Sequence, residues 1–180
     1  MVSLKCYFFE ASILMAMLVV APSLAGLDVK VTTGVVKDSC FKTQDPSFCL
    51  GVLNKIPQVS SVDLPGLANI TINLATSNAT KTLQRIKSLI PKTSERQLKE
   101  AYTSCSEHYD DAIGDLDDAK KNLTEGDSNG VNLSVSAAMD EASDCDDEIN
   151  DLPADASIIK ANQDLNKICD IILAISKSNI

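Results

Sequence analysis

The fold is decided by residues 98–123, which read LKEAYTSCSEHYDDAIGDLDDAKKNL. Within this stretch, apolar or small residues recur every three or four positions, which is the spacing of one face of an α-helix. The positions between them are mostly polar or charged, as expected of a helix face in water. The stretch therefore predicts a long amphipathic helix whose stripe is Leu98, Ala101, Cys105, His108, Ala112, Leu116, Ala119 and Leu123.

The residues that flank this stretch predict where the helix begins and ends. Ser94 and Gln97 have the spacing of a capping box, in which the Gln97 side chain reaches back to the amide of the capping residue. We therefore expect the helix to open at Thr93 or Ser94 and to end at Gly126 and Asp127.

Three further segments show the same helical spacing. One begins at Asp63 and stops at Pro91, one follows Gly130 and stops before Pro153, and one begins near Asp155. Four such helices with short connections can bury their stripes against one another, which predicts an all-α, antiparallel up-down-up-down four-helix bundle. The three additional stripes are Ile72, Ala75, Ala79, Thr82, Ile86 and Leu89; Val131, Val135, Ala138, Ala142, Cys145 and Ile149; and Ile158, Ala161, Leu165, Ile168, Ile172 and Ile175.

The N-terminal part of the chain holds two different segments. Residues 1–25 are typical of a secretory signal peptide, with a ten-residue apolar core and small residues near the end, so we expect cleavage after Ala25. Ten apolar residues are too few to span a bilayer, which needs about 20. The mature domain, residues 26–180, would then consist of an N-terminal hairpin of short helical pieces in 26–60 and the bundle in 61–180.

Five cysteines remain after signal cleavage, and an oxidising compartment would pair four of them. The sequence alone leaves several connectivities open. Cys40 and Cys49 flank a proline nine residues apart, which favours a local bond within the hairpin. Cys105 and Cys145 would then pair between two helices. Cys169 lies in an apolar stretch, and we expect it to be a buried free thiol.

The composition narrows the classes of partner. The net charge of −9 argues against nucleic acid and suits a basic protein, because opposite charge speeds encounter. No other apolar run approaches membrane length, so we expect no membrane association after signal cleavage. Four sequons are candidate N-glycosylation sites, at Asn69, Asn78, Asn122 and Asn132.

The sequence provides no recognisable catalytic or metal-binding motif. His108 is the only histidine, so a Ser-His-Asp or Cys-His site would have to use it, and its place on a helical stripe favours a structural role. A zinc site of histidine and cysteine is disfavoured because the cysteines are expected in disulfides. Asp144, Asp146 and Glu148 have the first spacings of a calcium loop. However, Ile149 stands where the turn requires glycine. We therefore predict no enzyme activity, no cofactor and no metal.

Acidic residues are concentrated in two clusters on the second and third predicted bundle helices. Such clusters are either solvated helix faces or a negatively charged docking surface, and the sequence leaves both interpretations open. The clusters are Asp110, Asp111, Asp115, Asp117 and Asp118, and Asp144, Asp146, Asp147, Glu148 and Asp151.

Motifs spread over the mature chain resemble a known family. Residues 40–49 read CFKTQDPSFC, residues 101–112 read AYTSCSEHYDDA, residues 136–138 read SAA ahead of the fourth mature cysteine, and residues 164–169 read DLNKIC. Together they resemble the plant invertase and pectin methylesterase inhibitor family. The resemblance implies a four-helix bundle preceded by a helical hairpin, with disulfides Cys40–Cys49 and Cys105–Cys145.

The resemblance also distinguishes between the two branches of the family. Invertase inhibitors carry Gly-Asp-Pro-Lys-Phe where this chain has GDSNG at residues 126–130, which favours the pectin methylesterase branch. The implied function is a secreted inhibitor that binds pectin methylesterase one-to-one over its active-site cleft and excludes pectin. Family contact positions fall on Glu107, Asp111, Asn132 and Asp147.

Two alternative functions remain open: an inhibitor of acid invertase, and a secreted helical binding protein that inhibits no enzyme. In each case we expect an extracellular protein of the apoplast or cell wall that is a monomer when free.

Overall fold

The computed structural model describes residues 31–57 and 59–178. The predicted signal peptide, residues 1–25, lies outside the described residues. Within the described ranges the secondary structure is entirely helical. The helices are α1 (Thr33–Cys40), α2 (Pro46–Leu53), α3 (Leu64–Leu89), α4 (Arg96–Glu125), α5 (Ser128–Ile149) and α6 (Ala156–Ser176), with short 3-10 helices η1 (Val59–Ser61) and η2 (Ile90–Lys92).

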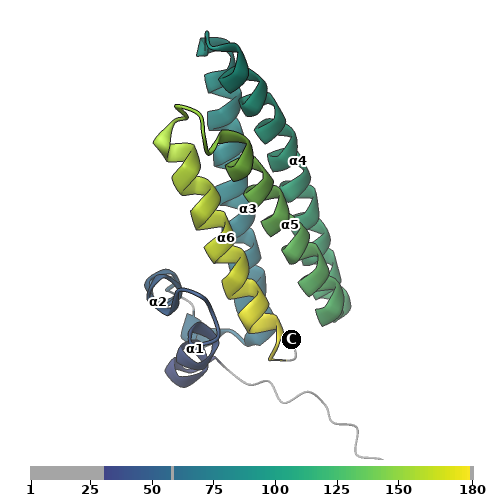
Figure 1. The fold of residues 1–180 in the computed structure, drawn as a ribbon. Coiled ribbons are helices and arrows are strands. Elements are labelled where there is room, and N and C mark those ends of the chain that lie inside the picture. The colour runs from purple at the N-terminus through teal and green to yellow at the C-terminus, as the bar shows by residue number, and fades with distance from the viewer. Residues whose placement is uncertain (1–30, 58, 179–180) are drawn as a thin grey trace, which may run out of the picture.

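The four long helices, α3 to α6, form a bundle and run side by side in Figure 1. α4 packs on α3 and α5, and α6 packs on α5 and α3, so the four helices close into a ring. Each helix is joined to the next by a short connection, which makes sequential neighbours antiparallel. The predicted all-α, up-down-up-down bundle preceded by a disulfide-linked helical hairpin is therefore confirmed.

The apolar stripes supply the bundle core. In α5, all six positions of the predicted stripe are buried, from Val131 at one end to Ile149 at the other. In α3, the buried set extends beyond the predicted stripe to Leu67, Ala68 and Thr71 near its N-terminus. Fully burying a Val, Leu or Ile side chain stabilises the fold by about 1.5–3 kcal/mol. The core therefore accounts for the association of helices that would be marginal alone.

Two positions near the core differ from the predicted stripes. His108 is only half-buried at the edge of the bundle, whereas its neighbour Tyr109 is fully buried. Asn162 is also fully buried, although no stripe included it. The two buried polar groups satisfy each other, since the Tyr109 hydroxyl donates to Oδ1 of Asn162 at 2.7 Å. Burial raises the pKa of the Tyr109 phenol well above its ordinary value, so this group remains a neutral donor.

Two helix starts also differ from prediction. Glu95 caps α4 in place of Ser94, and its carboxylate accepts from the backbone N–H groups of Gln97 and Leu98. A single glutamate therefore satisfies two of the free backbone amides in the first turn of the helix. α5 begins at Ser128, ahead of the start predicted from its apolar stripe, because Asp127 caps it. α3 and α6 begin at the predicted places, with Asp63 and Asp155 as their capping residues.

The helical hairpin α1–α2 packs on one end of the bundle, beside α3 and α6 (Figure 1). The Cys40–Cys49 disulfide joins the two short helices, with Cα atoms 5.4 Å apart. Nζ of Lys167 on α6 lies 2.9 Å from a carboxylate oxygen of Asp45 and 5.3 Å from the ring centre of Phe48. These polar contacts and a shared apolar cluster hold the hairpin on the bundle.

Asp155 connects the start of α6 to α3, and this contact leads to a pH-dependent prediction. Its carboxylate accepts from the Ser157 backbone N–H at 2.9 Å and from Arg85 at 2.6 Å. Hydrogen bonds from Ser157 and then Arg85 lower the pKa of Asp155 from 3.8 to about 2. We expect Asp155→Ala to reduce the free energy of unfolding at pH 7 by about 1 kcal/mol, the usual effect of losing a cap.

The sign of the pH effect follows from the lowered pKa. The Asp155 contribution is present above pH 3.8 and is lost as the pH falls towards 2, because the unfolded state takes up the proton first. Urea denaturation of the parent and the variant at pH 7 and near pH 2 tests this. The difference between them should shrink at the lower pH. Asp151→Ala, at an exposed position in the same connection, is the control and should match the parent at both.

Candidate functional site

The candidate site is the acidic face of the α4–α5 pair. The Cys105–Cys145 disulfide joins the two helices, with Cα atoms 4.6 Å apart. Both cysteines are fully buried, so the bond lies beneath the face and not on it. A covalent link between two antiparallel helices fixes their relative register, and it thereby fixes which acidic residues face one another.

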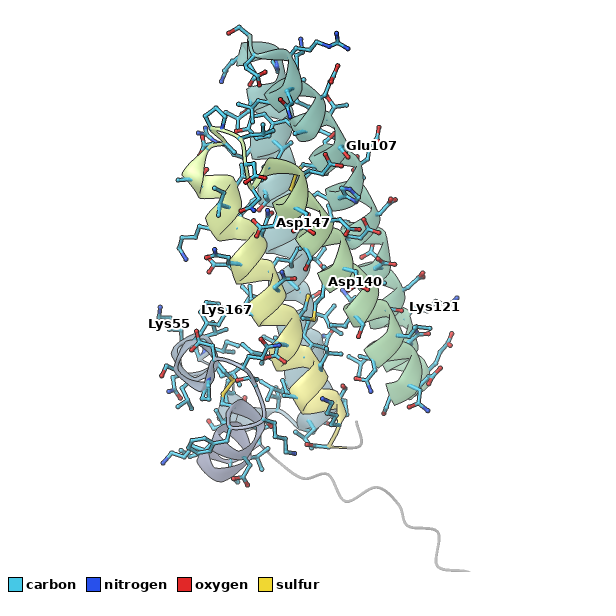
Figure 2. The ribbon with its side chains drawn as sticks, viewed as in Figure 1. Lys55, Glu107, Lys121, Asp140, Asp147 and Lys167 are labelled. Atoms are coloured by element: carbon cyan, nitrogen blue, oxygen red, sulfur yellow. A yellow bond between two sulfur atoms is a disulfide. The ribbon has the colours of Figure 1, made fainter. Side chains whose placement is uncertain are left out.

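Three of the four predicted contact residues are exposed on this helix pair. Glu107 and Asp111 are one turn apart on α4, and Asp147 is near the end of α5 (Figure 2). Among the described residues, none of the three takes part in a salt bridge, although six other pairs do. Their carboxylates are therefore available to a partner without first breaking an internal ion pair.

Asn132 is placed differently from the other three. It is half-buried, and its Oδ1 accepts a hydrogen bond from the Ser176 hydroxyl on α6. It lies 15 residues from Asp147 along α5, which is about 22 Å of helix. The structure therefore does not bring Asn132 together with the three carboxylates, and its side chain is already engaged within the bundle.

The face also contains a contact that the sequence analysis did not identify. Nδ1 of His108 on α4 lies 2.6 Å from a carboxylate oxygen of Glu141 on α5, and both side chains are about one-quarter exposed. Glu141 was not singled out because one glutamate on a helix is uninformative by itself. The signal lay in the register: pairing Cys105 with Cys145 places the next turn of α4 beside the preceding turn of α5.

Negative charge accumulates along the seam between the two helices. Burial raises the pKa of Asp115, and the nearby charges of Glu141, Asp111 and Asp118 raise it further. Burial is the larger cause, and the smaller one is repulsion between neighbouring ionised carboxylates. The seam is therefore a place where a cationic group would be stabilised.

The described residues do not assemble a nucleophile and base. The only histidine bonds to Glu141 through Nδ1, and no hydrogen bond among the described residues joins its ring to a serine, threonine or cysteine. Cys169, the one free cysteine in the described part of the chain, is fully buried. Burial raises the pKa of its thiol to about 12, which keeps it protonated and unreactive.

The connection between α4 and α5 bears on the choice between the family's branches. Gly126 has a φ of 72°, which glycine adopts without steric cost, and Asp127 caps α5 by accepting from the Gly130 amide at 2.9 Å. A β-carbon on residue 130 would lie 2.7 Å from side-chain atoms of Asn122 and Asp127. Both side chains are held by hydrogen bonds. A larger side chain at residue 130 would therefore require the Asn122 and Asp127 side chains to move.

The fold and this face together define a class: a disulfide-linked helical bundle with an exposed acidic face. The family model for plant invertase/pectin methylesterase inhibitors matches residues 34–175. This chain belongs to that family.

Similar proteins include inhibitors from several plants. Pectinesterase inhibitor 2 of Arabidopsis thaliana is 40% identical, over 78% of this chain and 82% of that protein. The pectinesterase inhibitor of Actinidia deliciosa is 37% identical, over 92% of this chain and 90% of that protein. A crystal structure of a mutant pectin methylesterase inhibitor from Arabidopsis superposes with a TM-score of 0.73 and 37% identity, over 78% of this chain and 94% of that one.

The relatives fall into two groups by name. Three named as pectinesterase inhibitors are 36–40% identical to this chain. Four named as inhibitors of invertase or fructosidase are 26–34% identical. The family and these relatives are named as inhibitors, in agreement with the prediction that the chain is not an enzyme.

Among the described residues, no helix combines the length and apolar character needed to cross a bilayer.

Proposed function

We propose that this protein is an inhibitor of pectin methylesterase that binds one-to-one over the active-site cleft and excludes pectin. The observation that carries the proposal is the likeness to pectinesterase inhibitors at 36–40% identity, above that to the invertase and fructosidase inhibitors. The GDSNG segment at residues 126–130 supports the same branch, since it lacks Pro-Lys-Phe.

The proposed docking surface is the acidic face of α4 and α5, with Glu107, Asp111 and Asp147 as contact residues. These carboxylates are exposed and have no internal ion pair. They would pair with basic and polar groups around the esterase cleft, where a desolvated charge pair contributes far more than one at the rim. Asn132 is retained as a contact position at the far end of α5, and docking there would compete with its bond to Ser176.

The proposal extends to the setting in which the protein works. We propose that residues 1–25 are removed as a signal peptide, and that residues 26–180 act in the apoplast as a monomer when free. N-glycosylation is proposed for some of Asn69, Asn78, Asn122 and Asn132. All four asparagines are half-buried in helices, so a glycan at any of them would have to extend into solvent past the neighbouring side chains of its helix.

A paired titration tests the proposed function. Residues 26–180, made in an oxidising host, are titrated against a plant pectin methylesterase and a plant acid invertase. We expect loss of esterase activity at near-stoichiometric inhibitor, with the invertase unaffected. Loss of invertase activity alone would assign the protein to the other branch. A folded protein without effect on either enzyme would favour a non-inhibitory binding bundle.

A further inference from the structure

His108, Glu141 and Asp144 converge on the α4–α5 seam in a way that the proposed inhibition does not use. One ligand atom from each residue lies within 4.8 Å of the other two. Glu141 and Asp144 are three residues apart on α5, so they project from the same side of that helix. His108 faces them from α4, with Nδ1 2.6 Å from Glu141.

We propose that His108, Glu141 and Asp144 form a binding site for a divalent transition-metal cation such as Zn²⁺. One imidazole and two carboxylates match the ligand preferences of zinc, and three protein ligands leave a fourth position for water. Two ligands of a tetrahedral zinc ion are about 3.4 Å apart, given bonds of about 2.1 Å. Small side-chain rotations would bring these three atoms to that separation.

The residues around the three ligands also favour the binding of a cation. His108, Asp144, Asp147 and Glu148 line an open hollow, so water can reach the ion and complete its coordination. Two further exposed carboxylates, Asp147 and Glu148, line the same hollow, and a dication would offset their negative charge. In the part of the chain that the structure describes, no lysine or arginine forms a salt bridge with Glu141 or Asp144.

The disulfide pre-organises the site. Cys105 is one turn before His108 on α4, and Cys145 directly follows Asp144 on α5. The bond between them fixes the backbone on both sides of the ligand set. Metal binding therefore has to order only three side chains and not two helices. The presence of imidazole also predicts selectivity, because calcium takes oxygen ligands and gains nothing from His108.

The single histidine makes a direct test possible. Zinc chloride is titrated at pH 7.5 into the disulfide-intact protein without a histidine tag, and binding is followed by calorimetry and by the NMR signals of the imidazole ring. We expect one zinc ion per chain and a shift or broadening of the His108 signals, with calcium chloride leaving them unchanged. Unmoved imidazole signals at saturating zinc, or an equal response to calcium, would overturn the proposal.

Variants distinguish zinc binding at this site from a general attraction of zinc to an acidic surface. His108→Gln and Asp144→Asn should each weaken zinc binding at least about tenfold, since even outer-shell changes cost 10–100-fold. Asp140→Asn removes the same charge from an exposed position on α5 outside the ligand set and should bind zinc like the parent (Figure 2). Wild-type affinity in His108→Gln, with an unchanged helical circular-dichroism spectrum, would contradict the assignment. No esterase is involved, so this outcome is independent of the proposed inhibition.

Discussion

Replacement of both Cys105 and Cys145 by alanine should lower the free energy of unfolding by about 4 kcal/mol. The bond closes a loop of 40 residues, and the chain-entropy model assigns about that amount to a loop of this length. For a domain of this size the loss corresponds to about 8–16 °C in melting temperature. Alanine suits both positions because each sulfur is fully buried, where a serine hydroxyl would need a partner.

The hairpin disulfide provides the matched comparison. Replacing Cys40 and Cys49 by alanine opens a loop of only 9 residues, for which the same model gives about 2.7 kcal/mol. Thermal melting and urea denaturation of the two double variants, both without new free thiols, should therefore rank the bundle bond above the hairpin bond. Equal losses, or a larger loss from the hairpin pair, would show that loop entropy does not govern the stability of this fold.

The features that the sequence predicts well are those with a local cause. The stripe of α5 is buried in full, and α3 and α6 begin at the predicted places, where Asp63 and Asp155 cap them. Helical periodicity and capping depend on residues within a few positions of one another. The bundle follows from them because four amphipathic helices with short connections have few other ways to bury their stripes.

The features that the sequence does not predict depend on contacts between distant segments. Tyr109 replaces His108 in the core because its hydroxyl meets Asn162, 53 residues later in the chain. Neither residue alone indicates that a polar pair will be buried. The same applies to the site, where Asn132 is engaged by Ser176 from another helix. His108 meets Glu141 only through the register of α4 against α5.

The acidic face leads to the last prediction, which concerns inhibition and not stability. We expect Asp147→Ala and Asp111→Ala each to weaken inhibition of pectin methylesterase by about 30-fold or more, if the carboxylate is desolvated in the complex. Truncating one partner of such a pair costs about 2–5 kcal/mol, and 2 kcal/mol is roughly 30-fold in affinity. Melting should change little, because both side chains are exposed and have no internal ion pair.

The controls make the same change of charge at residues outside the proposed contacts. Asp140→Ala on α5 and Asp117→Ala on α4 remove one exposed carboxylate each from the same two helices. If long-range attraction alone holds the complex, all four variants should lose a similar, small amount of affinity, and the loss should disappear at high salt. If direct contacts hold it, Asp111→Ala and Asp147→Ala should dissociate faster than both controls, and the difference should persist in salt. Equal inhibition constants for all four would place the docking surface elsewhere on the bundle.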